Sequence, residues 1–181
     1  MILYYYLQEV IYKSCDRISD EADAIQFPIE FLESIEDSGL PPHELKLKIG
    51  APIILIRNLK PPQLCNGTRL VVRALGKTVV QAKILTGVST GETVFIPRIP
   101  LTSANVPFAF VRLQFPIKLC FALSINKSQG QTYEQVGVCL EEQCFSHGQL
   151  YVALSRVSTQ AGLFVYSATT HVQNIVYKEV L

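Results

Sequence analysis

The middle of the chain is dominated by apolar runs and alternating patterns of a length typical of β-strands. Residues Pro52 to Ile56 form a continuous apolar run, which suits a strand that is covered on both faces. Three β-rich runs follow, at Arg69 to Leu75, Thr78 to Leu85 and Glu92 to Ile96, and short glycine-containing segments join them. Short strands with tight glycine turns predict a small antiparallel sheet or barrel.

The pattern changes after Phe115-Pro116, where apolar runs alternate with a segment of helical periodicity. We expect strands at Lys118 to Ser124, Val136 to Leu140 and Leu163 to Tyr166, with a helix at Ser146 to Val157. In the helical segment, apolar residues recur at the spacing of one helix face. Alternation of strands with a helix favours a parallel sheet with crossover connections.

The N-terminal part of the chain is less regular. Residues Leu7 to Arg17 alternate loosely and predict a strand, and acidic, broken sequence follows to Asp23. Pro28 suits the first turn of a short helix through Ile35, which Ser38-Gly39 would end. The apolar stretch Met1 to Leu7 has no basic lead-in and is too short for a signal peptide or a membrane span, so we interpret it as a strand or a frayed terminus and expect no membrane partner.

Charge is distributed unevenly, although the net charge of the 181 residues is only +1. Met1 to His43 carries two basic and nine acidic residues, Glu44 to Lys118 carries eleven basic and two acidic residues, and the remainder carries three and four. A basic middle is what a surface that follows a phosphate backbone needs, because cationic side chains on phosphates release counterions. Solvated strand faces would give the same pattern, so charge alone leaves both interpretations open.

Cysteine and histidine usage argues against a metal site. The five cysteines include no Cys-x-x-Cys pair, and His43, His147 and His171 are too dispersed to suggest a metal site or a catalytic triad. The odd number of cysteines and the lack of secretory features indicate reduced thiols inside a cell. We therefore expect no metal ligands in this chain.

The segment Leu75-Gly76-Lys77-Thr78 contains the Gly-Lys-Thr sequence of a phosphate-binding loop but lacks the surrounding residues and elements of such a loop. Such a loop needs an earlier glycine, at the position that Val71 occupies here, and a helix after the lysine. The sequence that follows is β-rich instead. We therefore predict that Gly76-Lys77 is a hairpin turn.

Two polar stretches carry the candidate chemistry. The first, Ile125 to Thr132, follows an apolar run, and the second, Gln149 to Arg156, ends in an arginine on the predicted helix. In α/β proteins, chemistry concentrates in such loops at a sheet edge, so we expect the two stretches to lie side by side. The alternatives are a polar loop capped by Ser128 and a structural ion pair of Arg156.

These two stretches resemble motifs V and VI of superfamily-one helicases, and their sequences are most similar to those of the Pif-type DNA helicases and their relatives in Helitron transposons. The resemblance extends from about Val10 to the last residue. Further matching segments are Leu40 to Pro52, Ile56 to Leu59, Leu64 to Leu70, Phe95 to Arg98, Gln114 to Pro116 and Ser146 to Tyr151. Single short motifs are weak evidence, whereas many of them in order are strong evidence.

The resemblance implies an α/β fold: part of a RecA-like parallel-sheet domain with an inserted small antiparallel β-barrel of the Src-homology type. Residues 1–64 and 112–181 would be the N-terminal and C-terminal parts of the second RecA-like domain of a helicase. Residues 65–111 would be the inserted barrel. Motifs V and VI would then lie in residues 112–181.

The resemblance also implies site residues. Arg156 would be a catalytic arginine finger, and Gln129 and Gly130 would join it at the nucleotide. Single-stranded DNA would contact Ser124, Asn126, Lys127, Ser128 and Thr132, with Arg57, Asn58 and Arg69 as further candidates. For Arg57 an ion pair, and for Asn66-Gly67 a turn, explain the sequence equally well. Many family members have histidine at the position of Asn126 and threonine at that of Ser124, so the transfer there is less specific.

The implied function is that of the C-terminal half of an ATP-dependent 5′-to-3′ DNA helicase, which would act in the cell nucleus. The resemblance does not decide between roles in DNA repair, recombination, telomere maintenance and transposition. ATP and Mg²⁺ would be cofactors of the complete enzyme. The sequence contains no second Gly-Lys-Thr/Ser and no acidic Mg²⁺ motif. The partner that supplies them would be the missing first RecA-like domain. This chain alone is therefore predicted to bind no cofactor stably and to hydrolyse no ATP. The alternatives are an inactive DNA-binding fragment or transposon remnant, and a protein-interaction scaffold.

Overall fold

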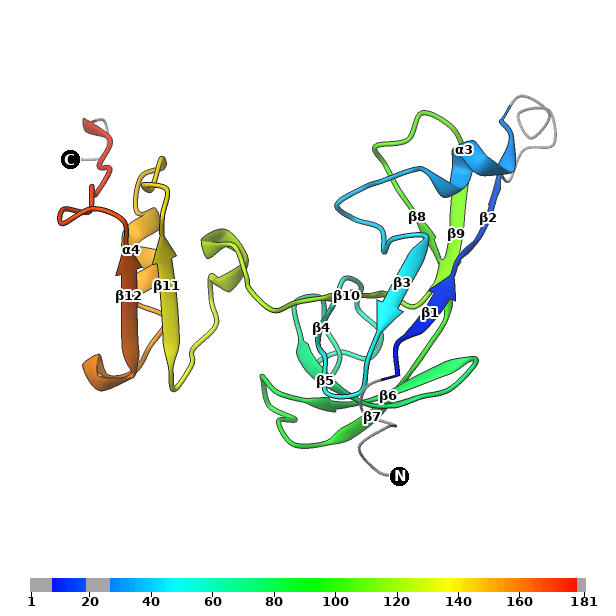
Figure 1. Ribbon diagram of the computed structural model, residues 1–181, viewed down its shortest axis with the longest axis horizontal. Coiled ribbons are helices and arrows are strands. Elements are labelled where there is room, and N and C mark those ends of the chain that lie inside the picture. Colours follow the sequence, from blue (N-terminus) through cyan, green and yellow to red (C-terminus); the bar gives the residue numbers. More distant parts are fainter. Residues whose placement is uncertain (1–7, 19–26, 179–181) are drawn as a thin grey trace. The chain divides into compact units, whose positions relative to one another are not determined.

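The computed structural model describes residues 8–18 and 27–178, and the chain divides into two compact units, Met1–Phe121 and Ala122–Leu181 (Figure 1). The fold is mixed α/β and mostly sheet. The strand or frayed terminus expected at Met1 to Leu7 lies outside the described residues, as does most of the acidic segment that ends at Asp23. Among the described residues no helix is long and apolar enough to cross a membrane.

The largest sheet of the first unit has five strands in the order β10-β4-β5-β6-β7, and all of its neighbours are antiparallel. The strands are β4 (Pro52–Leu55), β5 (Arg69–Leu75), β6 (Val79–Ile84), β7 (Thr93–Pro97) and β10 (Ile117–Leu119). The predicted strands β4 to β7 are therefore confirmed to within two residues at each end. Alternation located β5, β6 and β7, which each bury one face, and a continuous apolar run located β4, whose residues are buried on both faces.

The hairpin between β5 and β6 confirms the interpretation of Gly76-Lys77 as a turn. The amide of Gly76 donates a hydrogen bond of 3.0 Å to the carbonyl of Val79. A Cβ atom at Gly76 would lie 2.9 Å from the same carbonyl oxygen, so this turn is tight enough to require glycine. A strand follows the lysine where a phosphate-binding loop would need a helix.

Two smaller sheets complete the first unit. In one, β1 (Val10–Lys13) pairs antiparallel with β3 (Glu44–Leu47). In the other, β9 (Phe110–Gln114) lies between β2 (Cys15–Ile18) and β8 (Ile99–Thr102). The strand predicted at Leu7 to Arg17 is thus two strands that join different sheets. The chain switches sheets at Ser14, whose amide donates to the carbonyl of His43.

The short helix α3 (Ile29–Glu33) confirms the prediction that proline starts a helix here, because Pro28 occupies the position before its first residue. The helix ends at Glu33, with Ser34 as its C-cap, which is two residues before the predicted end at Ile35. At the C-terminal end of the helix, the backbone carbonyls of Leu32 and Glu33 accept hydrogen bonds from the side chain of Arg112.

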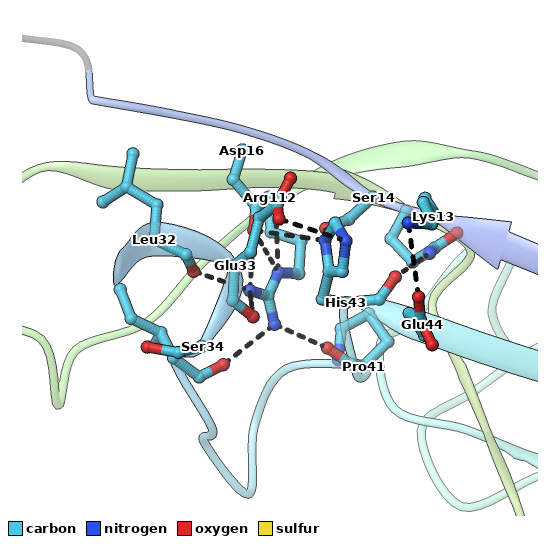
Figure 2. Close-up of polar contacts among 12 residues, drawn as sticks. Lys13, Ser14, Asp16, Leu32, Glu33, Ser34, Pro41, His43, Glu44 and Arg112 are labelled. Carbon is cyan, nitrogen blue, oxygen red and sulfur yellow. Dashed lines mark hydrogen bonds and ion pairs between the residues drawn. The ribbon is translucent and has the colours of Figure 1, made fainter. Parts of the chain in front are cut away.

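Arg112 lies at the centre of a buried polar cluster in the first unit (Figure 2). Its guanidinium is fully buried and contacts both carboxylate oxygens of Asp16, with the shortest nitrogen–oxygen distance at 2.7 Å. It also donates to backbone carbonyls, including those of Ile35 and Pro41. A buried guanidinium is tolerated only when its donors are satisfied, so Arg112 joins β9, β2, α3 and the loop before β3.

The main hydrophobic core of the first unit draws on strands from both sides of the predicted barrel segment. Buried side chains from β5, β6 and β7 pack with Leu55 of β4 and Ile117 of β10, and Tyr12 and Leu45 from the β1–β3 pair join them. Two strands of the five-stranded sheet therefore lie outside residues 65–111. The domain limits 1–64, 65–111 and 112–181, and closure of the sheet into a barrel, stay predictions.

In the second unit, β11 (Val136–Leu140) pairs parallel with β12 (Leu163–Ser167), and helix α4 (Gln149–Leu154) lies between them in the chain. Ala153 and Leu150 of α4 pack with Val138 and Leu140, so the helix covers one face of this pair. The predicted parallel strand–helix–strand unit is confirmed. The 3-10 turn η1 (Ile125–Ser128) precedes this unit, and a second one, η2 (Gln160–Gly162), lies between α4 and β12.

Two predicted elements near the motifs are wrong in extent. The strand expected at Lys118 to Ser124 ends at Leu119, and it pairs antiparallel with β4 in the first unit instead of joining a parallel sheet. The helix expected at Ser146 to Val157 spans only Gln149–Leu154. It stops because Val157 forms a β-bridge with Tyr133, which requires extended backbone there.

Candidate nucleotide and DNA site

The first polar stretch forms a compact turn with an exposed rim in the second unit. Ser124 precedes the 3-10 turn η1, and Ser128 closes it by donating a hydrogen bond of 2.7 Å from its hydroxyl to the carbonyl of Ile125. The hydroxyl of Ser128 is therefore used internally, and the residue is only 9% exposed. The remaining candidates of this stretch are exposed: Ser124, Asn126, Lys127, Gln129, Gly130 and Thr132.

Gly130 gives the stretch its sharp exit from the turn. Its φ of 77° lies in the left-handed region, which side chains with a Cβ rarely adopt. Directly after it, the amide of Gln131 donates to the carbonyl of Ser128. The side-chain amide of Gln131 donates to the carbonyl of Lys127. These bonds hold the backbone on both sides of Gln129 and Gly130 in one conformation.

Arg156 connects the second polar stretch to the first. Its Nη1 donates a hydrogen bond of 3.1 Å to the carbonyl of Gln131, and its own carbonyl accepts a hydrogen bond of 2.8 Å from the amide of Tyr133. Nε donates to the carbonyl of Val152 and Nη2 donates to the hydroxyl of Ser155. The predicted juxtaposition of the two stretches is thus present within the second unit.

The environment of Arg156 differs from the alternative of a structural ion pair. Its partners in these bonds are two backbone carbonyls and one hydroxyl, all uncharged. A guanidinium has five N–H donors, and the three bonds use three of them. The side chain is half-buried, and within the described part of the chain these bonds leave two of its N–H groups for a further acceptor.

A glycine keeps the two stretches close. Gly162, at the end of η2, lies against the segments that directly follow the two stretches: a Cβ atom at this position would fall 2.1 Å from the carbonyl oxygen of Glu134 and 2.9 Å from Cγ2 of Val157. The β-bridge between Tyr133 and Val157 lies at the same place. Sequence patterns did not single out Gly162, because its importance arises only from this close approach.

The three candidates of the first unit have structural partners. Arg57 donates to the carbonyls of Ile56 and Thr102, and the side-chain oxygen of Asn58 accepts a hydrogen bond of 2.7 Å from the amide of Asn66. Gly67 follows with a φ of 89°, so Asn66-Gly67 forms the turn that the sequence allowed. The amide of Arg69 donates to the hydroxyl of Thr86. Their assignment to DNA contact stays a prediction.

Sequence analysis missed a polar cluster around Asp37. The carboxylate of Asp37 accepts hydrogen bonds from the hydroxyl of Ser103, from the amide of Gly39 at 2.9 Å and from the side chain of Asn105 at 3.1 Å. These bonds, that of Ser103 foremost, lower the pKa of Asp37 to about 2. No local pattern signals this cluster, because Ser103 and Asn105 lie far away in the chain.

The Asp37 cluster borders a surface pocket of about 690 Å³ in the first unit. Its wall includes Leu40 and Leu45, with Glu44 and Lys46 on β3 and Lys118 on β10. Lys118 donates to the carbonyls of Asp37 and Ser38, so its ammonium group is held by the loop. The pocket is lined by charges of both signs and by a large apolar wall. It therefore does not present the cluster of positive charges that a phosphate group needs.

Metal chemistry has no candidate site in the parts of the chain that the structure describes. No group of three or more His, Cys, Asp or Glu side chains there is placed to hold an ion. The described cysteines are all free thiols, and two of them, Cys120 and Cys144, are buried.

Comparison with known proteins relates these features to a helicase family. The family model of the DNA helicase Pif1, 2B domain, matches residues 30–75, a range that overlaps the predicted inserted barrel only over residues 65–75. The human ATP-dependent DNA helicase PIF1 is 37% identical over 139 residues, which cover 74% of this chain and 21% of that protein. The chain thus spans about a fifth of the length of this relative.

Solved structures show the same relationship. The crystal structure of the Pif1 helicase from Candida albicans matches with a TM-score of 0.69 and 30% identity, over 95% of this chain and 42% of that chain. Bacteroides Pif1 bound to ssDNA matches with a TM-score of 0.61 and 26% identity, over 88% of this chain and 35% of that chain. The family model, the human relative and the solved structures together support placing this chain in the Pif1 helicase family, as a partial region of its members.

Proposed function

We propose that the chain is the C-terminal portion of an ATP-dependent 5′-to-3′ DNA helicase of the Helitron-associated, Pif-type subgroup. In this proposal residues 122–181 belong to a second RecA-like domain, and the antiparallel strands of the first unit include its inserted β-module. The relative named ATP-dependent DNA helicase PIF1 supports the reaction class. Action in the nucleus follows from the same proposal.

The contact between Arg156 and Gln131 is the observation that carries the proposal. It joins a permanent positive charge to the polar stretch that contains Gln129 and Gly130. In the complete enzyme, Arg156 would donate its remaining N–H groups to the terminal phosphate of ATP held by a first RecA-like domain. A planar guanidinium spreads the negative charge that develops during phosphoryl transfer.

ATP and Mg²⁺ fit this chain only in part. Arg156 and the backbone around Gly130 supply donors for phosphate oxygens. A lysine on the phosphates and an acidic group for Mg²⁺ would come from the first RecA-like domain, because the sequence has neither motif. The chain's own residues would bind and orient the nucleotide from one side.

Single-stranded DNA is the proposed polymer substrate. The side chains of Asn126, Lys127 and Thr132 are exposed on the rim of the first stretch and supply amide, ammonium and hydroxyl groups. Such groups contact phosphates and hold a strand without reading its bases. The solved Bacteroides relative bound to ssDNA supports this choice.

Salt-dependent binding tests the DNA contact. We expect the chain to bind fluorescein-labelled oligo(dT) in an anisotropy titration, with an affinity that falls as salt rises. Replacing Lys127→Gln removes one phosphate contact, so the slope of log affinity against log salt decreases by about 0.7. Lys178→Gln, which removes an exposed lysine outside both stretches, is the matched control and leaves the slope unchanged. Binding that is equally strong at low and high salt would contradict the proposal.

An inactive DNA-binding fragment or transposon remnant is the second candidate. The absence of a second Gly-Lys-Thr/Ser from the sequence favours it over an enzyme that acts alone. Genomic DNA upstream of the codon for Met1 distinguishes the two candidates. A Gly-Lys-Thr loop encoded in frame there supports the helicase, and an interrupted frame supports the remnant.

A further inference from the structure

The outer face of strands β5, β6 and β7 is defined by their register. The inward positions are buried apolar residues, such as Val72, Ala82 and Val94 in one row across the sheet. The alternate positions point outward because side chains alternate along a strand. The outward positions that matter here are Lys83, opposite Val71 and Thr93, and Gln81, opposite Ala74 and Phe95.

A β-bulge adds a cation to this face. The register of β5 and β6 shifts between Val72 and Ala74, which leaves Arg73 as the extra residue of the bulge. Arg73 is exposed, and the two residues of a bulge share the side of the residue that they oppose, here the outward-facing Gln81. The bulge therefore brings Arg73 to the same row as Gln81 and Phe95.

The charge of the outer face has one sign. Strands β5, β6 and β7 contain Arg69, Arg73 and Lys83 and no acidic residue. Among the described residues, neither Arg73 nor Lys83 takes part in an ion pair. Lys77 adds a further exposed cation in the β5–β6 hairpin. Such a face attracts a polyanion, since its charges are not neutralised by neighbours.

Phe95 is the aromatic residue of this face and is 63% exposed. It lies on β7, an edge strand of the sheet in Figure 1, with Gln81 opposite it and Lys83 one row away. The neighbours of Phe95 on β7, Val94 and Ile96, are buried, so the ring is directed away from the core. An exposed ring beside cations suits stacking of an unpaired base while phosphates meet the charges.

We propose that the outer face of β5–β6–β7 is a second contact surface for single-stranded DNA, with a base stacked on Phe95 and phosphates against Arg73 and Lys83. This inference rests on the proposed function and assigns its polymer substrate a surface in the first unit. A single strand fits better than a duplex, because the bases of a duplex are stacked on one another and do not offer a face to Phe95. An acidic protein would satisfy the cations and leave the ring without a stacking partner.

A tryptophan reporter tests the stacking. The chain contains no tryptophan, so Phe95→Trp introduces a single fluorophore on the outer face. We expect oligo(dT) to quench its emission with the same midpoint as the anisotropy titration. Phe31→Trp, at an aromatic position on α3 outside this sheet, is the control and stays unquenched. Poly-glutamate, which has charge but no bases, is expected to leave Phe95→Trp unquenched, as is duplex DNA.

Charge variants test the phosphate contacts. The double variant Arg73→Gln with Lys83→Gln is expected to lower the salt slope of oligo(dT) binding by about 1.4, because each contact contributes about 0.7. Lys13→Gln with Lys48→Gln removes the same charge from exposed positions outside the sheet and leaves the slope unchanged.

The outcomes separate this inference from the proposed function. Saturable oligo(dT) binding with an unquenched Phe95→Trp or an unaltered slope in the Arg73 and Lys83 variant would overturn the inference and leave the proposed function standing. Quenching of Phe95→Trp by poly-glutamate would overturn it in favour of an acidic protein partner. Failure of the unmodified chain to bind oligo(dT) would overturn both.

Discussion

At the scale of single residues, the side chains with the most specific environments serve the architecture. Asp37 accepts hydrogen bonds from Ser103 and Asn105 in a distant segment of the first unit, and Arg112 satisfies a carboxylate and several carbonyls while it is fully buried. Arg156 has the same character, since its guanidinium binds the chain's own oxygens. Its proposed catalytic role depends on the donors that remain.

The charge of Asp37 gives a prediction at this scale. Ser103→Ala removes the largest cause of the low pKa of Asp37, so we expect that pKa to rise from about 2 toward its ordinary value of 3.8. Carboxyl chemical shifts followed by NMR across an acid titration measure the change. Ser38→Ala is the matched control, because the hydrogen bond of Ser38 is the smallest of the causes, and its shift is expected to be the lesser one.

The same residue makes stability depend on pH in a defined direction. The pKa of Asp37 is lower in the folded chain than its ordinary value, so its contribution to stability is present above pH 3.8 and is lost as the pH falls toward 2. Ser103→Ala is therefore expected to weaken this loss in acid unfolding. An acid transition identical to that of the unmodified chain would contradict the assignment of Ser103 as the main cause.

At the scale of elements, the β-bridge between Tyr133 and Val157 decides where the second unit places its motifs. It ends α4 and aligns the two polar stretches, and η2 packs against it through Gly162. Parallel pairing of β11 with β12 supports this arrangement, since α4 covers one face of the pair. The site is thus built by packing of short elements more than by any long helix.

Gly162→Ala tests this packing. The added Cβ would meet the carbonyl oxygen of Glu134 at 2.1 Å, so the backbone must shift, and we expect a loss of about 1–3 kcal/mol in the free energy of unfolding. Urea denaturation followed by circular dichroism measures it. Gly137→Ala is the control, because a Cβ atom on β11 at that position meets no atom within 4 Å. Equal stability of the two variants would contradict the close approach.

At the scale of the whole molecule, the chain carries one side of a proposed nucleotide site. We predict that the isolated chain hydrolyses no ATP above background with or without oligo(dT), because lysine and Mg²⁺ motifs are missing from its sequence. Phosphate release measured with a coupled assay checks this. DNA-stimulated turnover that disappears in the Arg156→Ala variant would contradict the prediction.

The strands β4 to β7, β11 and β12 and the Gly76-Lys77 hairpin were predictable from sequence because each is encoded by a few consecutive residues. Alternation of apolar and polar positions reports a strand with one buried face, and glycine reports a tight turn. The resemblance to Pif-type helicases was likewise detectable from sequence, because several short segments match that family in the same order along the chain. The juxtaposition of Arg156 with the first polar stretch followed from the expectation that polar loops of an α/β sheet gather at one edge.

Only the tertiary structure decided which strands pair, where α4 ends and what the charged side chains contact. The partner of β10 is β4, the helix stops at a bridge to Tyr133, and Arg112 meets Asp16 across 96 residues of sequence. Contacts between segments distant in sequence depend on the packing of the folded chain, and no local periodicity records them. Sequence by itself determined the elements and the family resemblance, whereas three-dimensional packing determined the partners of each charged group, because burial and hydrogen bonding are satisfied only in the assembled fold.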